Sequence, residues 1–240
     1  MMVLKDLLHL LYTAHNSYQT LHIRWQYHYT SDGINSLMKR WANQQPIGSF
    51  TYIPTASSPQ QAQIDYELWR TQNVWRVDYS QLNNQEEKYI QVTKPNERWS
   101  YDTQRKKLIT NNRQFVSPDS SIHIQYSGAF GRRLHEFQLL DPSFLLATHH
   151  FEVEHDTQYV GRPVHVIKAT YQRHAEMLHE PFFWATADEY QLLVDREYGI
   201  LLRYAALIDD TEMAVTETQQ VAFNNQIDSS IFSLGIVISE

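Results

Sequence analysis

Residues 21–29 alternate strictly between apolar and polar side chains, and this run limits the fold more than any other part of the sequence. Every odd position is apolar or aromatic, and every even position is His, Arg or Gln. Successive side chains of a β-strand point to opposite faces of its sheet. The run therefore predicts a strand with one buried face and one solvated face.

Shorter strand-like runs follow along most of the chain, separated by polar turns. Aromatic residues, which favour strands, are frequent, with 15 Tyr, 10 Phe and 6 Trp. Strands at this spacing, without crossover helices of about ten residues or more between them, predict a mostly β fold built on an antiparallel meander. The expected strands are 64–68, 75–79, 89–93, 98–101, 107–110, 151–159, 164–171, 189–195, 200–207 and 214–223.

Two segments predict helices. Apolar residues recur at helical spacing over 3–14, which favours an amphipathic helix packed on a core. A short helix is expected over 141–150, with Asp141 as its cap and Pro142 at its first position.

The remaining segments are expected to be turns and loops. Residues 31–33 predict a turn, 43–59 a long loop and 83–87 a hairpin loop. The sequence has no internal repeat and no firm boundary, so we expect a single domain over 1–240.

Composition and charge exclude several classes of function. The formal net charge is −7, from 20 basic and 27 acidic residues. An acidic balance argues against nucleic-acid binding, which needs a basic surface, and against adsorption to anionic lipids. The sequence contains no cysteine, which excludes disulfides, thiolate metal sites, cysteine nucleophiles and a lipidated cysteine.

The sequence carries no targeting signal that we recognise. No apolar run reaches the roughly 18 residues that a transmembrane helix needs. The leucine-rich start is interrupted by Lys5, Asp6 and His9, and no small-residue cleavage site follows, so it does not resemble a signal peptide. We leave the localisation open: cytoplasmic for the chain as it stands, or extracytoplasmic if an export signal has been removed.

No motif indicates catalysis or a cofactor. The chain lacks the nucleophile elbow of hydrolases, a phosphate-binding loop and the spacings of zinc sites. Its 12 histidines include a cluster at His149, His150 and His155. His150, Glu152 and Glu154 share one strand face, which is most simply a solvated face. We therefore expect no metal, no cofactor and no enzymatic activity.

Large aromatic side chains gather on the apolar faces of the predicted strands: Trp25, Tyr27, Trp75, Trp99 and Tyr101. They can be an ordinary packed core or the wall of a partly open cavity, and the sequence favours neither. Trp69 is out of phase with its run and does not join this set. Phe182, Phe183 and Trp184 follow Pro181 in a predicted loop, where a cavity mouth or a partner contact would explain them.

Three segments of the second half resemble a known superfamily. They are GRPVHVIKA from Gly161, DREYGILLR from Asp195 and FNNQID from Phe223, the last followed by Ile231 and Phe232. In this order and spacing they are similar to the LolA/LolB and MucB/RseB superfamily of lipoprotein-handling proteins. The resemblance covers residues 151–232 best. The chain departs from its carriers in lacking a signal peptide, and from its anchored receptors in lacking a lipidated cysteine.

The resemblance implies a strongly curved antiparallel half-barrel sheet with helices covering the concave face. Between sheet and helices it implies a cavity for an apolar ligand, which would be a lipid, an acyl chain or a lipidated peptide. The expected lining is the aromatic set above together with Phe144 and Leu145 from the helical lid.

Three functions follow from these observations. The first is non-catalytic binding of an apolar ligand or of a lipidated protein. The second is a regulatory or sensor domain of the MucB/RseB type that binds a protein partner. The third is a hydrolase of unknown class, retained because histidines are abundant.

Overall fold

The computed structural model describes residues 3–44, 61–81, 84–95, 97–111, 137–140, 142–147, 149–172 and 187–233. Within these ranges, eleven strands form one sheet in the order β6-β5-β4-β3-β2-β1-β11-β10-β9-β8-β7, and every neighbouring pair is antiparallel. The strands are β1 (Leu21–Thr30), β2 (Gln61–Arg70), β3 (Trp75–Gln81), β4 (Asn84–Lys94), β5 (Glu97–Asp102), β6 (Lys107–Asn111), β7 (His149–Tyr159), β8 (Arg162–Tyr171), β9 (Glu189–Asp195), β10 (Leu201–Ile208) and β11 (Thr211–Phe223).

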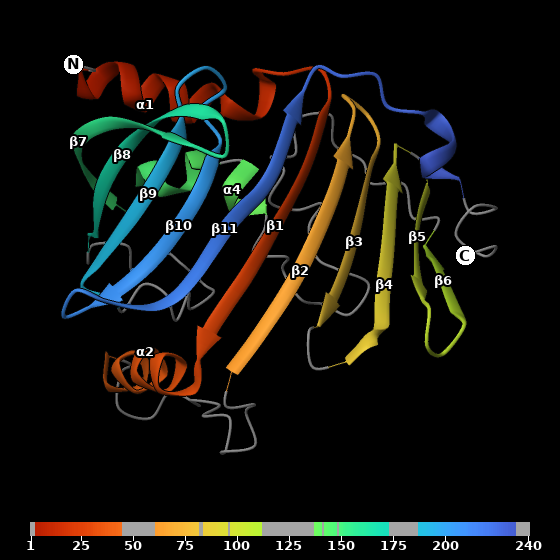
Figure 1. Ribbon diagram of the computed structural model, residues 1–240, viewed down its shortest axis with the longest axis horizontal. Helices are drawn as coiled ribbons and strands as arrows, with labels where there is room; N and C mark the ends of the chain where they lie inside the picture. The colour runs from red at the N-terminus through yellow and green to blue at the C-terminus, as the bar shows by residue number, and fades with distance from the viewer. Residues whose placement is uncertain are drawn as a thin grey trace.

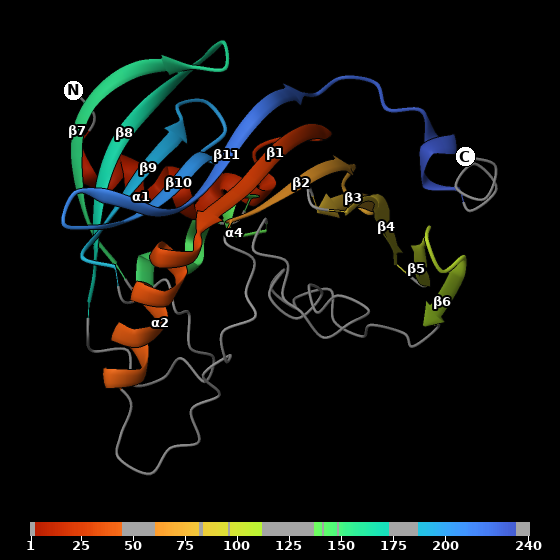
Figure 2. The ribbon, with the colours of Figure 1, turned by 60° about the horizontal axis from the view of Figure 1, so that its bottom comes forward.

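The sheet is open and strongly curved, as predicted. β6 and β7 form its two edges and do not pair with each other (Figure 1). Seen from below, the strands form an arch (Figure 2). The first and last of the long strands, β1 and β11, lie side by side at its centre, so the two halves of the chain share one sheet.

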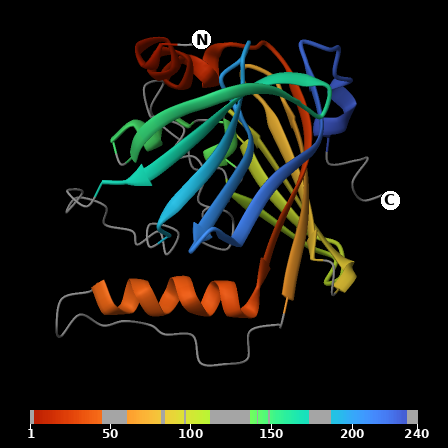
Figure 3. The ribbon, with the colours of Figure 1, turned by 60° about the vertical axis from the view of Figure 1, so that its left-hand side comes forward.

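Short helices cover part of the concave side. The α-helix α1 (Leu4–Thr13) and the 3₁₀ helix η2 (Pro142–Ala147) contact each other and β7, and α4 (Phe137–Leu140) contacts β10. α1 and α2 (Ser31–Gln44) lie at opposite ends of the strands (Figure 3). Two further 3₁₀ helices are η1 (Ala14–Asn16) and η4 (Ser229–Phe232). Among the described helices, none is long and apolar enough to cross a membrane.

The hydrophobic core is divided between the two faces of the sheet. The larger cluster joins the buried faces of α1, β1, β2 and β7–β10, with Leu7, Leu11 and Ile23 fully buried. A smaller cluster lies on the convex face, where Ile90, Val92 and Trp99 pack against Phe232 of η4.

The first expected turn is instead the start of a helix. Residues 31–33 begin α2, which continues to Gln44. The hydroxyl of Thr30 accepts a hydrogen bond from the backbone N–H of Gly33 at 3.0 Å, as an N-cap does. Ser31, Asp32 and Gly33 are residues of turns and also of first helical turns. The signal that separates the two is the apolar spacing of Ile34, Leu37, Met38 and Trp41 that follows.

Two further boundaries differ from the prediction. The polar segment 83–87 was expected to be a loop, but β4 begins at Asn84 and pairs with Gln81. The helix expected to reach His150 ends at Ala147, and His149 already starts β7. The predicted loop over 43–59 lies almost entirely outside the described residues.

The three segments that carry the family resemblance meet at one end of the sheet. The Arg162 guanidinium donates to the carboxylate of the fully buried Asp195 at 2.8 and 3.1 Å. It also lies 5.2 Å from the ring of Tyr198 and 5.0 Å from that of Phe223. Gly161 and Gly199 have φ angles of +75° and +74°, as expected for hairpin turns. The segments therefore build the hairpins and their junction.

Candidate ligand-binding face

Three of the predicted aromatic residues lie on the concave face. Strand register places Trp25 and Tyr27 of β1 on the same face as Leu68 and Trp75, because directly opposite residues share a face. All four side chains are buried. This face continues through β3 and β4.

An aromatic row crosses four strands on this face. Trp25, Tyr66, Tyr79 and Tyr89 are direct cross-strand neighbours on β1, β2, β3 and β4. Their successive ring centroids are 5.9, 5.8 and 5.0 Å apart, within the range of stacked aromatic pairs. We call these four residues the aromatic row.

The neighbouring positions extend the apolar surface. One register step away, Val221, Ile23, Leu68 and Val77 form a parallel aliphatic row on β11, β1, β2 and β3. Tyr27 lies on the other side of the aromatic row. Its burial, and to a smaller extent the nearby Tyr29, raise the pKa of its phenol well above the usual value, so the phenol stays neutral. The concave face is thus aromatic at its centre.

Trp99 and Tyr101 do not share this face, which corrects the predicted lining. They pair with Val92 and Ile90 and lie with them on the convex face. Trp99 is 1% exposed because it belongs to the small cluster under η4. The alternation in β5 correctly predicted that Trp99 and Tyr101 share one face of the strand. Alternation cannot show whether that face is the concave or the convex face of the sheet.

The predicted lid residues lie in the part of the chain that the structure describes, and the predicted mouth residues do not. Leu145 of η2 is fully buried in the larger cluster. Phe144 lies in the same 3₁₀ helix. Phe182, Phe183 and Trp184 lie outside the described residues, so their role stays a prediction.

Polar atoms without partners interrupt the concave face. In the part of the chain that the structure describes, four buried groups on this face between β11 and β4 lack a hydrogen-bond partner: Trp25 Nε1, Gln91 Nε2, Thr93 Oγ1 and Thr218 Oγ1. Buried polar side-chain atoms are usually hydrogen-bonded, so such a group needs an explanation.

Sequence reasoning missed Tyr66, Tyr79, Tyr89 and Thr218 as site residues. The three tyrosines fall in predicted strands, and the signal that could have found them is their phase with Trp25 once the strands are paired. Thr218 carries no such signal, because a β-bulge sets its position.

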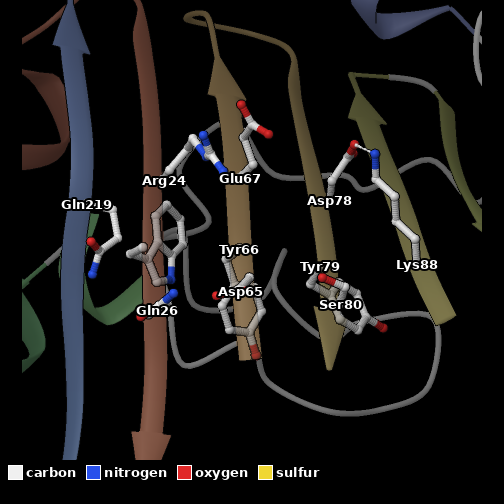
Figure 4. Close-up of a pocket in the computed structure, with 11 residues that line it drawn as sticks. Arg24, Gln26, Asp65, Tyr66, Glu67, Asp78, Tyr79, Ser80, Lys88 and Gln219 are labelled. Atoms are coloured by element: carbon white, nitrogen blue, oxygen red, sulfur yellow. Dashed lines mark ion pairs between the residues drawn. The ribbon is translucent and has the colours of Figure 1, made fainter. Parts of the chain in front are cut away.

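A hollow with a volume of about 240 Å³ lies on the other, convex face (Figure 4). Its lining is mainly polar and charged, with Arg24, Asp65, Glu67, Asp78 and Lys88 from four strands. It is therefore chemically unlike the apolar cavity predicted from the sequence.

Ion pairs organise this hollow. Arg76 donates twice to the Asp78 carboxylate, at 2.7 Å each, and Lys88 Nζ lies 3.1 Å from it. His22 lies 2.8 Å from Glu67, and its hydrogen bond is the main reason that the pKa of this carboxyl is lowered. Across the described ranges, no group of three or more His, Asp or Glu side chains is arranged to hold a metal ion.

The solved structures that are similar to this chain share little of its sequence. No family model and no curated protein matches the sequence. Solved structures similar to the chain include MucB and a LolA superfamily protein. Both names also occur in the superfamily that the sequence segments resemble.

Three of these structures illustrate the range. The MucA/MucB complex of Pseudomonas aeruginosa matches at 14% identity and a TM-score of 0.49, over 96% of this chain and 60% of that one. Lipoprotein LppX of Mycobacterium tuberculosis matches at 8% identity and a TM-score of 0.47, over 94% and 99%. A LolA superfamily protein of Nitrosomonas europaea matches at 9% identity and a TM-score of 0.37, over 98% and 100%.

The likeness concerns the course of the chain. This chain spans 62%, 60% and 59% of the length of three MucB structures that it matches. What the chain binds has to be inferred from its own side chains.

Proposed function

We propose that this chain binds an apolar, chain-like ligand on the concave face of the sheet without transforming it. The ligand would be a lipid, an acyl chain or a lipidated peptide. The observation that supports this proposal most directly is the aromatic row, which runs unbroken over four strands.

The row suits an extended hydrocarbon. Strands lie about 4.8 Å apart, so four neighbouring strands present roughly 14 Å of stacked ring surface. Each methylene removed from water contributes about 0.8 kcal/mol to binding. The cross-strand neighbours from Thr218 to Tyr89 include no charged side chain. A hydrocarbon chain lying over them would therefore not remove a charged group from water.

The proposal is tested by displacement of a fluorescent fatty acid. We expect saturable binding at micromolar protein, and we expect Tyr66→Leu to weaken it about three- to tenfold, because stacked aromatic contacts contribute about 0.5–1.5 kcal/mol beyond area. Trp69→Leu is the matched control. Trp69 lies on the same strand but on the convex face, where it stacks on His22 at 5.2 Å. Absence of saturable binding by the wild-type protein would refute the proposal.

A regulatory domain with a protein partner is the second candidate, and the convex hollow favours it. Mixed charges beside an open surface suit a polar protein contact better than an acyl chain. Arg24→Glu reverses an exposed charge in this hollow. It should abolish capture of such a partner and leave fatty-acid binding unchanged. If the purified protein binds fatty acid, and the Arg24→Glu variant captures the same proteins as the wild type, this second function is excluded.

A further inference from the structure

Two residues with unpaired polar groups lie directly opposite each other at one end of the aromatic row, next to a β-bulge. The pairing of β1 with β11 shifts between Arg24 and Trp25, so that Arg24 pairs with Gln220 and Trp25 pairs with Thr218. Gln219 is the extra residue, and it lines the convex hollow (Figure 4). The pairs from Tyr29 and Ala214 to Trp25 and Thr218 run in regular register up to this bulge, so Thr218 lies opposite Trp25 on the concave face. Bulges are frequent next to functional sites.

Both groups are deeply buried and unsatisfied. Trp25 and Thr218 are each 1% exposed. Neither the indole Nε1 nor the Thr218 hydroxyl has a hydrogen-bond partner among the residues that the structure describes. Most buried polar groups in folded proteins are paired, so two exceptions on directly opposite residues indicate a partner outside the residues that the structure describes.

We propose that Trp25 and Thr218 form a subsite for the carbonyl oxygen of an acyl ester or amide. This inference rests on the proposed function and specifies its ligand class. An indole N–H can only donate, so its partner must be an acceptor. A carbonyl oxygen has two lone pairs, which lets it accept from the indole and from the hydroxyl together.

The chemistry of the face selects a neutral acceptor. A hydrocarbon offers no acceptor and would leave both groups unpaired. An ionised carboxylate or phosphate at this subsite would be buried without a cation, since no residue from Thr218 to Tyr89 along the row is charged. The fluorescent fatty acid would therefore place only its hydrocarbon chain on the row, with its carboxylate outside the subsite. With its carbonyl at β1 and β11, the ligand's acyl chain would extend over Tyr66, Tyr79 and Tyr89.

The test compares methyl decanoate with dodecane, which has the same chain length and no carbonyl, as competitors of the fluorescent fatty acid. Trp25→Phe keeps an aromatic ring and removes the N–H, and Thr218→Val keeps the shape and removes the hydroxyl. Each is expected to weaken ester binding about two- to tenfold, the range of one net hydrogen bond, and to change dodecane binding less than about twofold. Trp69→Phe, on the opposite face, should change neither.

A second measurement needs no ligand. Replacing an unpaired buried hydroxyl by a methyl group should leave the melting temperature of Thr218→Val equal to or above that of the wild type. A clearly lower melting temperature would mean that the hydroxyl has a partner within the protein and would overturn the subsite.

The binding outcomes separate the two proposals. If the wild-type protein binds ester and alkane equally, or if both variants lose them equally, the subsite is wrong and the proposed function stands. If the wild-type protein binds neither, the proposed function fails and the subsite fails with it.

Discussion

At the scale of single residues, Asp195 shows how a buried charge stabilises a junction between strands. Its carboxylate accepts hydrogen bonds from Arg162 and from the backbone N–H groups of Glu197 and Tyr198 at 2.9 and 2.8 Å. Removing one partner of a buried pair typically costs about 3–5 kcal/mol. The conspicuous Gly-Arg-Pro and Asp-Arg-Glu-Tyr-Gly segments are thus two halves of one structural contact.

His149 makes stability depend on pH. It is buried beside Tyr190, with ring centroids 4.9 Å apart, and burial lowers its pKa from 6.5 to about 4. Between these values the unfolded chain binds more protons than the folded chain. The contribution to stability is therefore complete above about pH 6.5 and is lost as the pH falls towards 4.

We expect the wild-type protein to lose about 2 kcal/mol more unfolding free energy than His149→Phe between pH 7 and pH 5, since a full pKa unit corresponds to about 1.4 kcal/mol. Urea unfolding at the two pH values measures this difference. Equal losses in both proteins would show that His149 is not the group that titrates.

At the scale of elements, α1 is held in place by a close backbone contact with the turn between β9 and β10. A Cβ atom on Gly199 would lie 2.4 Å from the carbonyl oxygen of Leu10. Leu7 and Leu11 are fully buried, whereas Leu4 and Leu8 remain partly exposed. The helix therefore packs through only part of its apolar surface.

Alanine substitutions at two glycines distinguish the cost of backbone strain from the cost of disturbing this contact. Gly161 and Gly199 share the same positive φ, but a Cβ on Gly161 would meet nothing within 4 Å. Gly161→Ala should cost about 1–2 kcal/mol from its left-handed conformation alone. Gly199→Ala should cost about 3 kcal/mol or more, because α1 must also move. Urea unfolding compares them, and equal costs would contradict the contact.

At the scale of the whole molecule, buried apolar residues lie on the concave face of some strands and on the convex face of others. On β1 and β2 the buried apolar residues lie on the concave face, while on β4 and β5 Ile90, Val92 and Trp99 lie on the convex face under η4. Binding on one face and stabilisation on the other can therefore be changed separately.

Phe232→Ala tests this separation. Phe232 is 6% exposed in the convex cluster. Its truncation should lower the unfolding free energy by about 3–5 kcal/mol, as for other buried phenylalanines. Under conditions where the variant remains folded, its affinity for the fluorescent fatty acid should stay within about twofold of the wild type. A large loss of affinity would show that the two faces are coupled.

The sequence by itself determined the local features of this protein. Alternation over 21–29 gave the strand and its two faces, and the segment 189–195 coincides with β9. Asp228 caps η4 by accepting a hydrogen bond from the backbone N–H of Ser230, two residues along the chain. These features depend on neighbours in the chain, so a local pattern records them. The N-cap at Thr30 is equally local, but the turn that was predicted over 31–33 is wrong.

Only the tertiary structure decided which strands meet, in which register, and which face is concave. A shift of one residue in register moves every side chain to the other face, and alternation does not record it. Trp99 and Tyr101 therefore left the predicted lining, while Tyr66, Tyr79 and Tyr89 joined Trp25. Thr218 lies opposite Trp25 only because β1 pairs with β11, and these two residues are almost 200 positions apart along the chain.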